Sequence, residues 1–287
     1  HLFSEDHRSA QLLFESYMKH AGPGLRSIHP AAHSLEPDPN QPESQPESRP
    51  ESLGDNEIMR TYAIGDIHGA YKALIQCLKR SGFDHKKDRL IVMGDVCDGY
   101  PFVKQCIDEL LKIKQCDLVI GNHDKWTLDW ALLGEKPDVW TCQGGRRTME
   151  SYRGGPMPKA HIDFLSRGHL WVERGGQVFV HGGLDPARPL SEQSAFFLMW
   201  DRTLLDRAWR AQTDGHQRAF SSYAEIFVGH TTSQLYKTLQ PMHVCNVWNL
   251  DTGAGWSGKL TIMDVDSKEY WQADLSADLH GGTPDKL

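Results

Sequence analysis

The stretch LIVMGDVCDGYPFVKQCIDELLKI, residues 90 to 113, joins an apolar run directly to two carboxylates and then to a helix-like segment. Leu90 to Met93 is predicted to be a buried strand, and residues 101–113 open with a proline suited to the first turn of a helix. Asp95 and Asp98 stand between the two elements. Asp and Gly tolerate turn backbones, so this pair alone could mark a simple turn, and the rest of the chain has to decide.

The same alternation continues along the chain. Longer amphipathic segments, with helix candidates at 70–80 and 101–113, separate short apolar runs at 62–64, 90–93, 118–120, 178–180 and 226–228. This order is typical of βα units and predicts an α/β fold. The tail from Val244 to Trp271 alternates apolar and polar residues between glycine-rich turns, which predicts antiparallel strands. Together, the two patterns predict mixed sheets that are covered by helices.

The composition of the 287 residues is that of an ordinary globular protein, long enough for one large domain. A net charge of -7 argues against a non-specific nucleic-acid or membrane surface, so neither is expected as a partner. No run of 18 apolar residues and no secretory signal is visible. The six cysteines lack a CxxC pair, which favours reduced thiols and a cytoplasmic location. The nine tryptophans are expected in a packed core with some exposure at its rim.

The first 57 residues differ in composition from the rest. Residues 30–57 are rich in Pro, Glu and Ser and are predicted to be a flexible linker. Before it, the segment 1–29 contains QLLFESYMKH (11–20), a short amphipathic helix that could dock on the main domain, bind a partner or be an expression remnant. The main domain is predicted to span 58–287.

A potential metal ligand follows each predicted strand. The motifs are GDIHG (65–69), GDVCDG (94–99), GNHD (121–124), HGG (181–183) and GHT (229–231). In an open sheet, ligands bind beyond the carboxyl ends of the strands, so these motifs would meet at one rim. A lone His beside Gly is usually structural, but five motifs in the same position favour a metal site. Its predicted ligands are Asp66, His68, Asp95, Asn122, His181 and His230.

The residue types narrow the choice of ion. Imidazole and carboxylate without thiolate favour Mn, Fe, Zn, Co or Ni over Ca or Mg. Three His and two Asp exceed what one tetrahedral ion needs, so two divalent ions are predicted, bridged by Asp95. Ions about 3.5–4 Å apart could share a hydroxide formed near neutral pH.

The ordered motifs, with DTG at 251–253, resemble the calcineurin-like metallophosphoesterases over about residues 59–275. Within them they are most similar to the phosphoprotein phosphatase branch, in particular its compact bacterial and phage-type serine/threonine phosphatases. The resemblance implies a four-layer αββα sandwich with mixed sheets. It also implies that Asp66, His68 and Asp95 hold the first metal, with manganese favoured. By the same resemblance, the second metal is held by Asp95, Asn122, His181 and His230, and Asn122 also contacts the substrate phosphate.

The same resemblance assigns two catalytic residues. His123 would protonate the leaving group, and Asp98 would orient His123 rather than bind metal. A positioned general acid of this kind contributes about 10²- to 10⁴-fold to a rate. The two carboxylates after the strand thus have different predicted roles. Asp95 is predicted to bridge the metals, and Asp98 is predicted to orient the general acid His123.

Two positions depart from the family pattern. Asp124 stands where the family has Glu, a shorter carboxylate expected to keep the role of that position. Gly99 stands where the family has an arginine that clamps phosphate as a bidentate fork. Arg202 resembles the arginine of a W-x-R motif and is expected to bind phosphate instead.

Other polar residues are candidates for the surroundings of the site. Arg146 and Arg147 follow a glycine pair that could open a helix end towards an anion, although a solvated helix face is the alternative. Asn249 and Asp251 are expected to orient the His ligands or to close the sheet.

The resemblance implies a dinuclear-metal phosphomonoesterase. Its substrate would be phosphoserine or phosphothreonine in proteins, with phosphotyrosine or small phosphoesters next. Symmetrical bis(5'-nucleosyl)-tetraphosphate hydrolysis is an alternative. A different class also stays open: a catalytically weak protein that binds phosphorylated ligands in the same cleft, as the glycine at position 99 would allow.

Overall fold

The computed structural model describes residues 59–284, so the predicted N-terminal segment and linker lie outside the described residues. In chain order the elements are β1 (Thr61–Ile64), α2 (Tyr71–Arg80), β2 (Arg89–Val92), α3 (Val103–Leu110), β3 (Gln115–Leu118), α4 (Asn122–Leu133), α5 (Asp138–Trp140), a π-helical turn (Thr141–Gly145), α6 (Arg146–Ser151), α7 (Lys159–Ser166), β4 (Trp171–Arg174), β5 (Gln177–Val180), a 3₁₀ turn (Leu190–Glu192), α8 (Ala195–Trp200), α9 (Thr203–Thr213), β6 (Glu225–Val228), a 3₁₀ turn (Ser233–Tyr236), β7 (Met242–Val244), β8 (Val247–Asn249), β9 (Thr261–Asp264), β10 (Tyr270–Gln272) and α10 (Ser276–His280).

The strands form two five-stranded sheets, in the orders β10-β9-β1-β2-β3 and β4-β5-β6-β8-β7. Both are mixed, because β1 pairs parallel with β2 and antiparallel with β9, and β5 pairs parallel with β6 and antiparallel with β4. The prediction of antiparallel strands in the tail is right for the pairs β9–β10 and β7–β8. It misses the parallel pairing of β8 with β6, in which Val247 lies beside Ile226.

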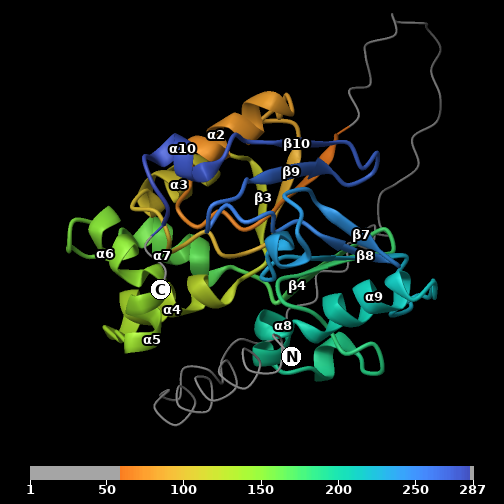
Figure 1. Cartoon of the computed structure of the whole chain (residues 1–287). Helices are drawn as coiled ribbons and strands as arrows, with labels where there is room; N and C mark the ends of the chain where they lie inside the picture. The colour runs from red at the N-terminus through yellow and green to blue at the C-terminus, as the bar shows by residue number, and fades with distance from the viewer. Residues whose placement is uncertain (1–58, 285–287) are drawn as a thin grey trace, which may run out of the picture.

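The alternation of side chains along single strands builds four layers. In β1, Tyr62 and Ile64 pack in the same core as helices α2 and α3, while Ala63 faces the other sheet. In β6, Phe227 contributes to the same central core, where its ring stacks on that of Phe179 at 4.6 Å between centroids. Helices α2, α3 and α10 cover one sheet and α8 and α9 the other (Figure 1). The αββα sandwich is therefore confirmed.

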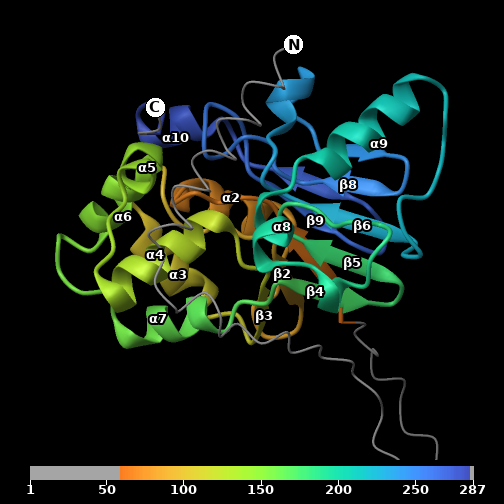
Figure 2. The same cartoon turned by 90° about the horizontal axis from the view of Figure 1, so that it is seen from below.

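Helices α4 to α7 gather at one end of the sandwich (Figure 2). The third apolar run, predicted at 118–120, is strand only up to Leu118, because Val119 pairs outside the sheet with His169 as the chain leaves β3. Helix α4 then begins at Asn122, directly at the rim where the strands end. Within residues 59–284, no helix has the length and apolar character needed to cross a bilayer.

The stacked phenylalanines between the sheets give a test of the central core. We expect Phe179→Ala to lower the free energy of unfolding by about 3–5 kcal/mol, because the ring is fully buried and leaves a cavity. The control Leu132→Ala, at a side chain 57% exposed, should change it by less than about 0.5 kcal/mol. Urea unfolding followed by circular dichroism measures both, and equal losses would contradict a core between the sheets.

Candidate active site

The predicted ligands converge at the carboxyl ends of the central strands. Side chains with potential ligand atoms within 4.8 Å of one another form two buried groups: His68, Asp95 and His123, and Asp95, His181 and His230. Asp95 belongs to both groups, as expected of a bridging carboxylate. The first group also contains His123, to which the family resemblance assigns proton transfer rather than metal binding.

Asp95 lies between two imidazoles. Its Oδ2 is 3.6 Å from Nε2 of His68 and 3.3 Å from Nε2 of His181. The Nδ1 atoms of these rings face the backbone carbonyls of Cys97 (2.9 Å) and Met93 (2.6 Å). Because a carbonyl only accepts, Nδ1 carries the proton and Nε2 is turned to the carboxylate. A histidine that binds metal through one nitrogen is typically oriented in this way by the other.

Asp66 and His230 carry the strongest sign of a cation site. The backbone N–H of His230 donates to Oδ2 of Asp66 at 3.0 Å. Oδ1 of Asp66 and Nε2 of His230 are buried and have no hydrogen-bond partner within the described part of the chain. A buried polar atom without a partner is costly, and a divalent ion would satisfy both atoms. Oδ1 of Asn122 lies 3.3 Å from Nε2 of His181, so the amide of Asn122 also reaches the second group of potential ligands.

The charges of the cluster are strongly coupled. Burial, reinforced by Asp251, raises the pKa of Asp66. Burial alone would raise the pKa of Asp95 too, but the imidazole of His181 and its neighbours lower it well below the usual range. Asp95 in turn raises the pKa of His181 to about 10 against the effect of burial. Burial and the Arg202 cation lower the pKa of His230 well below its usual value, which favours the neutral, metal-binding imidazole.

Four of the predicted residues have left-handed backbones. The φ angles are +48° at His68, +49° at Asp95, +68° at Asp98 and +62° at His230. Such angles are uncommon outside glycine, and strained backbone of this kind clusters at functional sites. The glycine at position 121 serves a related purpose, since a Cβ there would lie 2.1 Å from Oδ1 of Asp95. The loops are therefore shaped to aim side chains inward.

The predicted acid and its partner are in contact. Nδ1 of His123 lies 2.7 Å from Oδ2 of Asp98, which is fully buried. The His123 ring packs edge-to-face against His68 at 4.9 Å and against Trp126 at 5.2 Å. With Nδ1 occupied by Asp98, Nε2 is the nitrogen that can face a substrate.

Asp124 connects two of the loops. Its Oδ1 accepts hydrogen bonds from the backbone N–H groups of Val96 and Cys97, and its Oδ2 accepts one from Gly121. Burial raises its pKa to about 6. The shorter carboxylate thus reaches far enough to tie the loop after β2 to the start of α4.

The three candidate arginines differ in position. Nη1 of Arg202 donates to the backbone oxygen of His230 (2.7 Å) and to Oγ1 of Thr231 (3.1 Å), beside the cluster. Arg147 pairs with Glu150 at 2.8 Å, and Arg146 is exposed and has no partner among residues 59–284. Of the three, Arg202 alone has a described contact with a residue of the cluster.

The two tail residues lie behind His230. Nδ2 of Asn249 donates to the backbone oxygen of Thr231 at 2.7 Å, and Oδ1 of Asn249 accepts from the N–H of Asp251. This contact holds the loop that carries His230, in agreement with the expected positioning role. Asp251 acts electrostatically, since it raises the pKa of Asp66.

Sequence reasoning missed two residues that contact Asp98. Nε1 of Trp140 donates to both oxygens of Asp98, at 3.0 and 2.9 Å, and Oγ1 of Thr148 donates to Oδ1 at 2.6 Å. They lie 42 and 50 residues beyond Asp98 and follow no strand. Nothing in their local sequence marks them.

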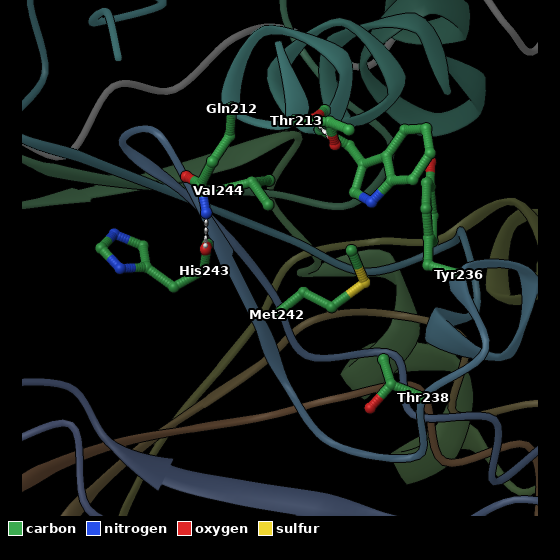
Figure 3. A pocket seen from close by; sticks show the side chains of 8 residues that line it. Gln212, Thr213, Tyr236, Thr238, Met242, His243 and Val244 are labelled. Carbon is green, nitrogen blue, oxygen red and sulfur yellow. Dashed lines mark hydrogen bonds between the residues drawn. The ribbon is translucent and has the colours of Figure 1, made fainter. Parts of the chain in front are cut away.

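A separate pocket of about 420 Å³ lies between α9 and the edge strand β7 (Figure 3). Its labelled side chains include Tyr236 and Met242, and the imidazole of His243 points away from them. The residues that line it include no carboxylate and none of the predicted metal ligands. It is therefore distinct from the metal cluster.

Comparison with known proteins supplies the family. Residues 59–262 match the family described as calcineurin-like phosphoesterase. The chain belongs to this family. The resemblance inferred from the motifs is confirmed, and the phosphoesterase is a hydrolase of phosphate esters whose family implies divalent metal ions. The alternative of a binding protein without catalysis is not favoured.

The individual relatives of this chain carry the names of two different phosphoesterase activities. The phosphoesterase is 31% identical to a symmetrical bis(5'-nucleosyl)-tetraphosphatase of Nitrosospira multiformis, over 76% of this chain and 97% of the relative. It is 27% identical to serine/threonine-protein phosphatase 1 of Salmonella typhimurium, over 71% and 91%. Among solved structures, a candidate diadenosine tetraphosphatase shares the fold with a TM-score of 0.57, at 17% identity over 76% of this chain and 94% of that one.

The shared position of Asp95 gives a test of the cluster. We expect Asp95→Asn to lower bound Mn²⁺ from about two ions per chain to less than one, because both groups lose their common charge. The control Asp117→Asn, which removes a carboxylate that pairs with Arg89 on β2, should leave the metal content unchanged. Elemental analysis after dialysis against Mn²⁺ measures both. Unchanged metal in Asp95→Asn would rule out a bridging role.

Proposed function

We propose that this phosphoesterase hydrolyses phosphomonoesters with two divalent ions, manganese in the first place, and with His123 as general acid. The observation that supports it most is the 2.7 Å contact between His123 and the buried carboxylate of Asp98. An imidazole held by a carboxylate is suited to protonate a leaving oxygen near neutral pH. A protein that only binds phosphorylated ligands has no need for such an acid.

For the metal ligands, we propose the two sets that the family resemblance implies. Asp66, His68 and Asp95 would hold one ion, and Asp95, Asn122, His181 and His230 the other. The ions would act as Lewis acids towards the phosphoryl oxygens and lower the pKa of a bound water. Residues of the chain supply the rest: Nε2–H of His123 donates a proton to the leaving oxygen, and Arg202 contacts the phosphoryl group.

Asp98 would keep His123 in the required state. Nδ1–H of His123 donates to Asp98, so the remaining proton is on Nε2 when the ring acts as an acid. Asp98 itself would not contact the metals, because its oxygens are occupied by donors from His123, Trp140 and Thr148. This separates the two carboxylates of the loop after β2 by role.

For the substrate, we propose phosphoserine or phosphothreonine in proteins, followed by phosphotyrosine and small phosphoesters. An aliphatic alkoxide is a strong base and leaves only slowly unless it is protonated, so a rigidly held acid has its largest effect on such esters. The similarity to serine/threonine-protein phosphatase 1 of Salmonella typhimurium, over 91% of that protein, supports this choice.

The second candidate is symmetrical hydrolysis of dinucleoside tetraphosphates. The 31% identity with the Nitrosospira enzyme, over 97% of that relative, supports it. In this reaction the leaving group is a nucleoside diphosphate, a much weaker base than an alkoxide. Protonation by His123 would then contribute less to the rate.

An arginine in place of Gly99 would be strained. Gly99 has a φ of +85°, and a Cβ at this position would lie 2.9 Å from the backbone oxygen of His68. We propose that Arg202 takes over the phosphate contact, with Asn122 beside it. Arg146 and Arg147 are weaker candidates, because Arg147 is paired with Glu150 and Arg146 is exposed.

A panel of substrates tests this proposal. Protein loaded with Mn²⁺ should hydrolyse p-nitrophenyl phosphate, and kcat/KM for phosphoserine peptides should exceed that for diadenosine tetraphosphate. His123→Ala should lower kcat on the peptides by about 10²-fold or more while the metal content stays constant. Higher kcat/KM on the dinucleotide would favour the second candidate. A parallel loss of metal would make His123 a ligand instead of an acid.

A second test concerns the phosphate contact. Arg202→Ala should lower kcat/KM by about 10- to 150-fold, the effect of a lost charge-assisted hydrogen bond of roughly 1.5–3 kcal/mol. Arg174→Ala is the matched control, since that arginine forms a half-exposed pair with Asp266 away from the cluster. Arg146→Ala and Arg147→Ala in the same assay show whether either residue contributes. An unchanged kcat/KM in Arg202→Ala would remove it from the site.

A further inference from the structure

Asp98 is held by more donors than a carboxylate that only orients a histidine would need. Besides His123, it accepts from the indole Nε1–H of Trp140 with both oxygens and from the hydroxyl of Thr148 with Oδ1. The same hydroxyl accepts from the backbone N–H of Asp98 at 3.0 Å. A further hydroxyl, that of Thr127, lies 3.5 Å from Oδ1. The carboxylate is 0% exposed, so these contacts are made without competition from water.

The two added donors come from a helical segment, residues 138–151, that packs on the loop after β2. Gly144 has a φ of +103°, and a Cβ there would lie 2.4 Å from the backbone nitrogen of Gly99. A Cβ on Gly145 would lie 2.4 Å from the ring of Trp140. The glycine pair therefore allows the segment to approach Gly99 and allows Trp140 to reach Asp98. The glycine pair thus has a packing role, which the sequence did not predict.

We propose that Trp140 and Thr148 are positioning residues of the general acid, a role that rests on the proposed function of His123. They fix both carboxylate oxygens of Asp98, so that the imidazole of His123 keeps Nε2–H directed at the leaving oxygen. A carboxylate without them could turn about its terminal bond, which is a soft torsion, and the imidazole would turn with it. In the assisted step the oxygen of a hydroxide ion derived from water forms a bond to phosphorus while the P–O bond to the leaving group breaks. The electron pair of the broken bond stays on the leaving oxygen, and that oxygen takes the proton from Nε2 of His123.

The proposal predicts a dependence on the leaving group that a purely structural role would not produce. Phenolate is a strong base and needs the proton, whereas p-nitrophenolate is a weak base and leaves with little help. Loss of the acid's positioning must therefore slow phenyl phosphate more than p-nitrophenyl phosphate. General packing damage would slow both alike.

Trp140→Phe tests the indole donor while keeping an aromatic ring in place. We expect kcat for phenyl phosphate to fall about 10- to 100-fold and kcat for p-nitrophenyl phosphate less than about 3-fold, with bound Mn²⁺ unchanged. The matched control is Trp130→Phe, because the Trp130 ring lies 5.8 Å from that of Trp140 but has no described bond to Asp98. It should leave the ratio of the two rates as in the wild type.

Thr148 gives an independent pair of variants in case Trp140→Phe does not fold. Thr148→Val keeps the shape but removes the hydroxyl, and it should change the ratio of the two rates in the same direction. Thr148→Ser restores the hydroxyl and should restore the ratio. Equal losses on both substrates in Trp140→Phe and Thr148→Val would overturn the proposal.

Failure of the proposed function would look different from failure of this inference. If wild-type protein with Mn²⁺ hydrolysed neither ester, the proposed function would be wrong. The positioning role would then be decided by proton NMR of the imidazole Nδ1–H of His123. Its slowly exchanging signal should be present in wild type and Trp130→Phe and lost in Trp140→Phe and Thr148→Val. Retention of the signal in both variants would contradict the role.

Discussion

The buried carboxylate of Asp95 is the constraint on which the rest of the site depends. A charge removed from water has to be paired or coordinated. Asp95 has imidazoles on two sides and accepts a hydrogen bond from the backbone N–H of His123 in the first turn of α4. Its neighbours Asp66 and His230 each keep one buried atom without a partner within residues 59–284. Divalent cations, which the family implies, would satisfy both. The left-handed loops and the close approach of Gly121 are the structural conditions for this arrangement.

The sandwich makes this arrangement possible because its central strands end on the same edge. β1, β2 and β3 run parallel in one sheet, and β5 and β6 run parallel in the other. The core between the sheets, which includes Ala63 and Phe227, holds the two edges together. Loops that carry charges can therefore meet on a rigid frame, and the energy of packing offsets the strain of their backbones.

The replacement of the family's arginine by Gly99 has a structural explanation. The helical segment 138–151 packs against this glycine and delivers two donors to Asp98. In the proposed mechanism the chain has thus lost a phosphate contact at one position and gained a more firmly held acid beside it. Under that proposed mechanism, a firmly held acid would assist esters of strongly basic alcohols more than anhydrides, whose leaving groups need less protonation.

Much of the fold and the metal cluster could be predicted from the sequence, because each ligand follows an apolar run directly and parallel strands end together. Asp66, Asp95 and His230 were predicted in this way, whereas the pairing of His123 with Asp98 was predicted from the resemblance to the family. Trp140 and Thr148 could not be found, since they reach Asp98 only when residues 138–151 fold onto a loop more than 40 residues away. The pairing of β9 with β1, which joins Asp264 to Tyr62, is of the same kind. Local patterns determine which side chains stand at strand ends, whereas contacts between distant segments depend on the packing of the whole chain.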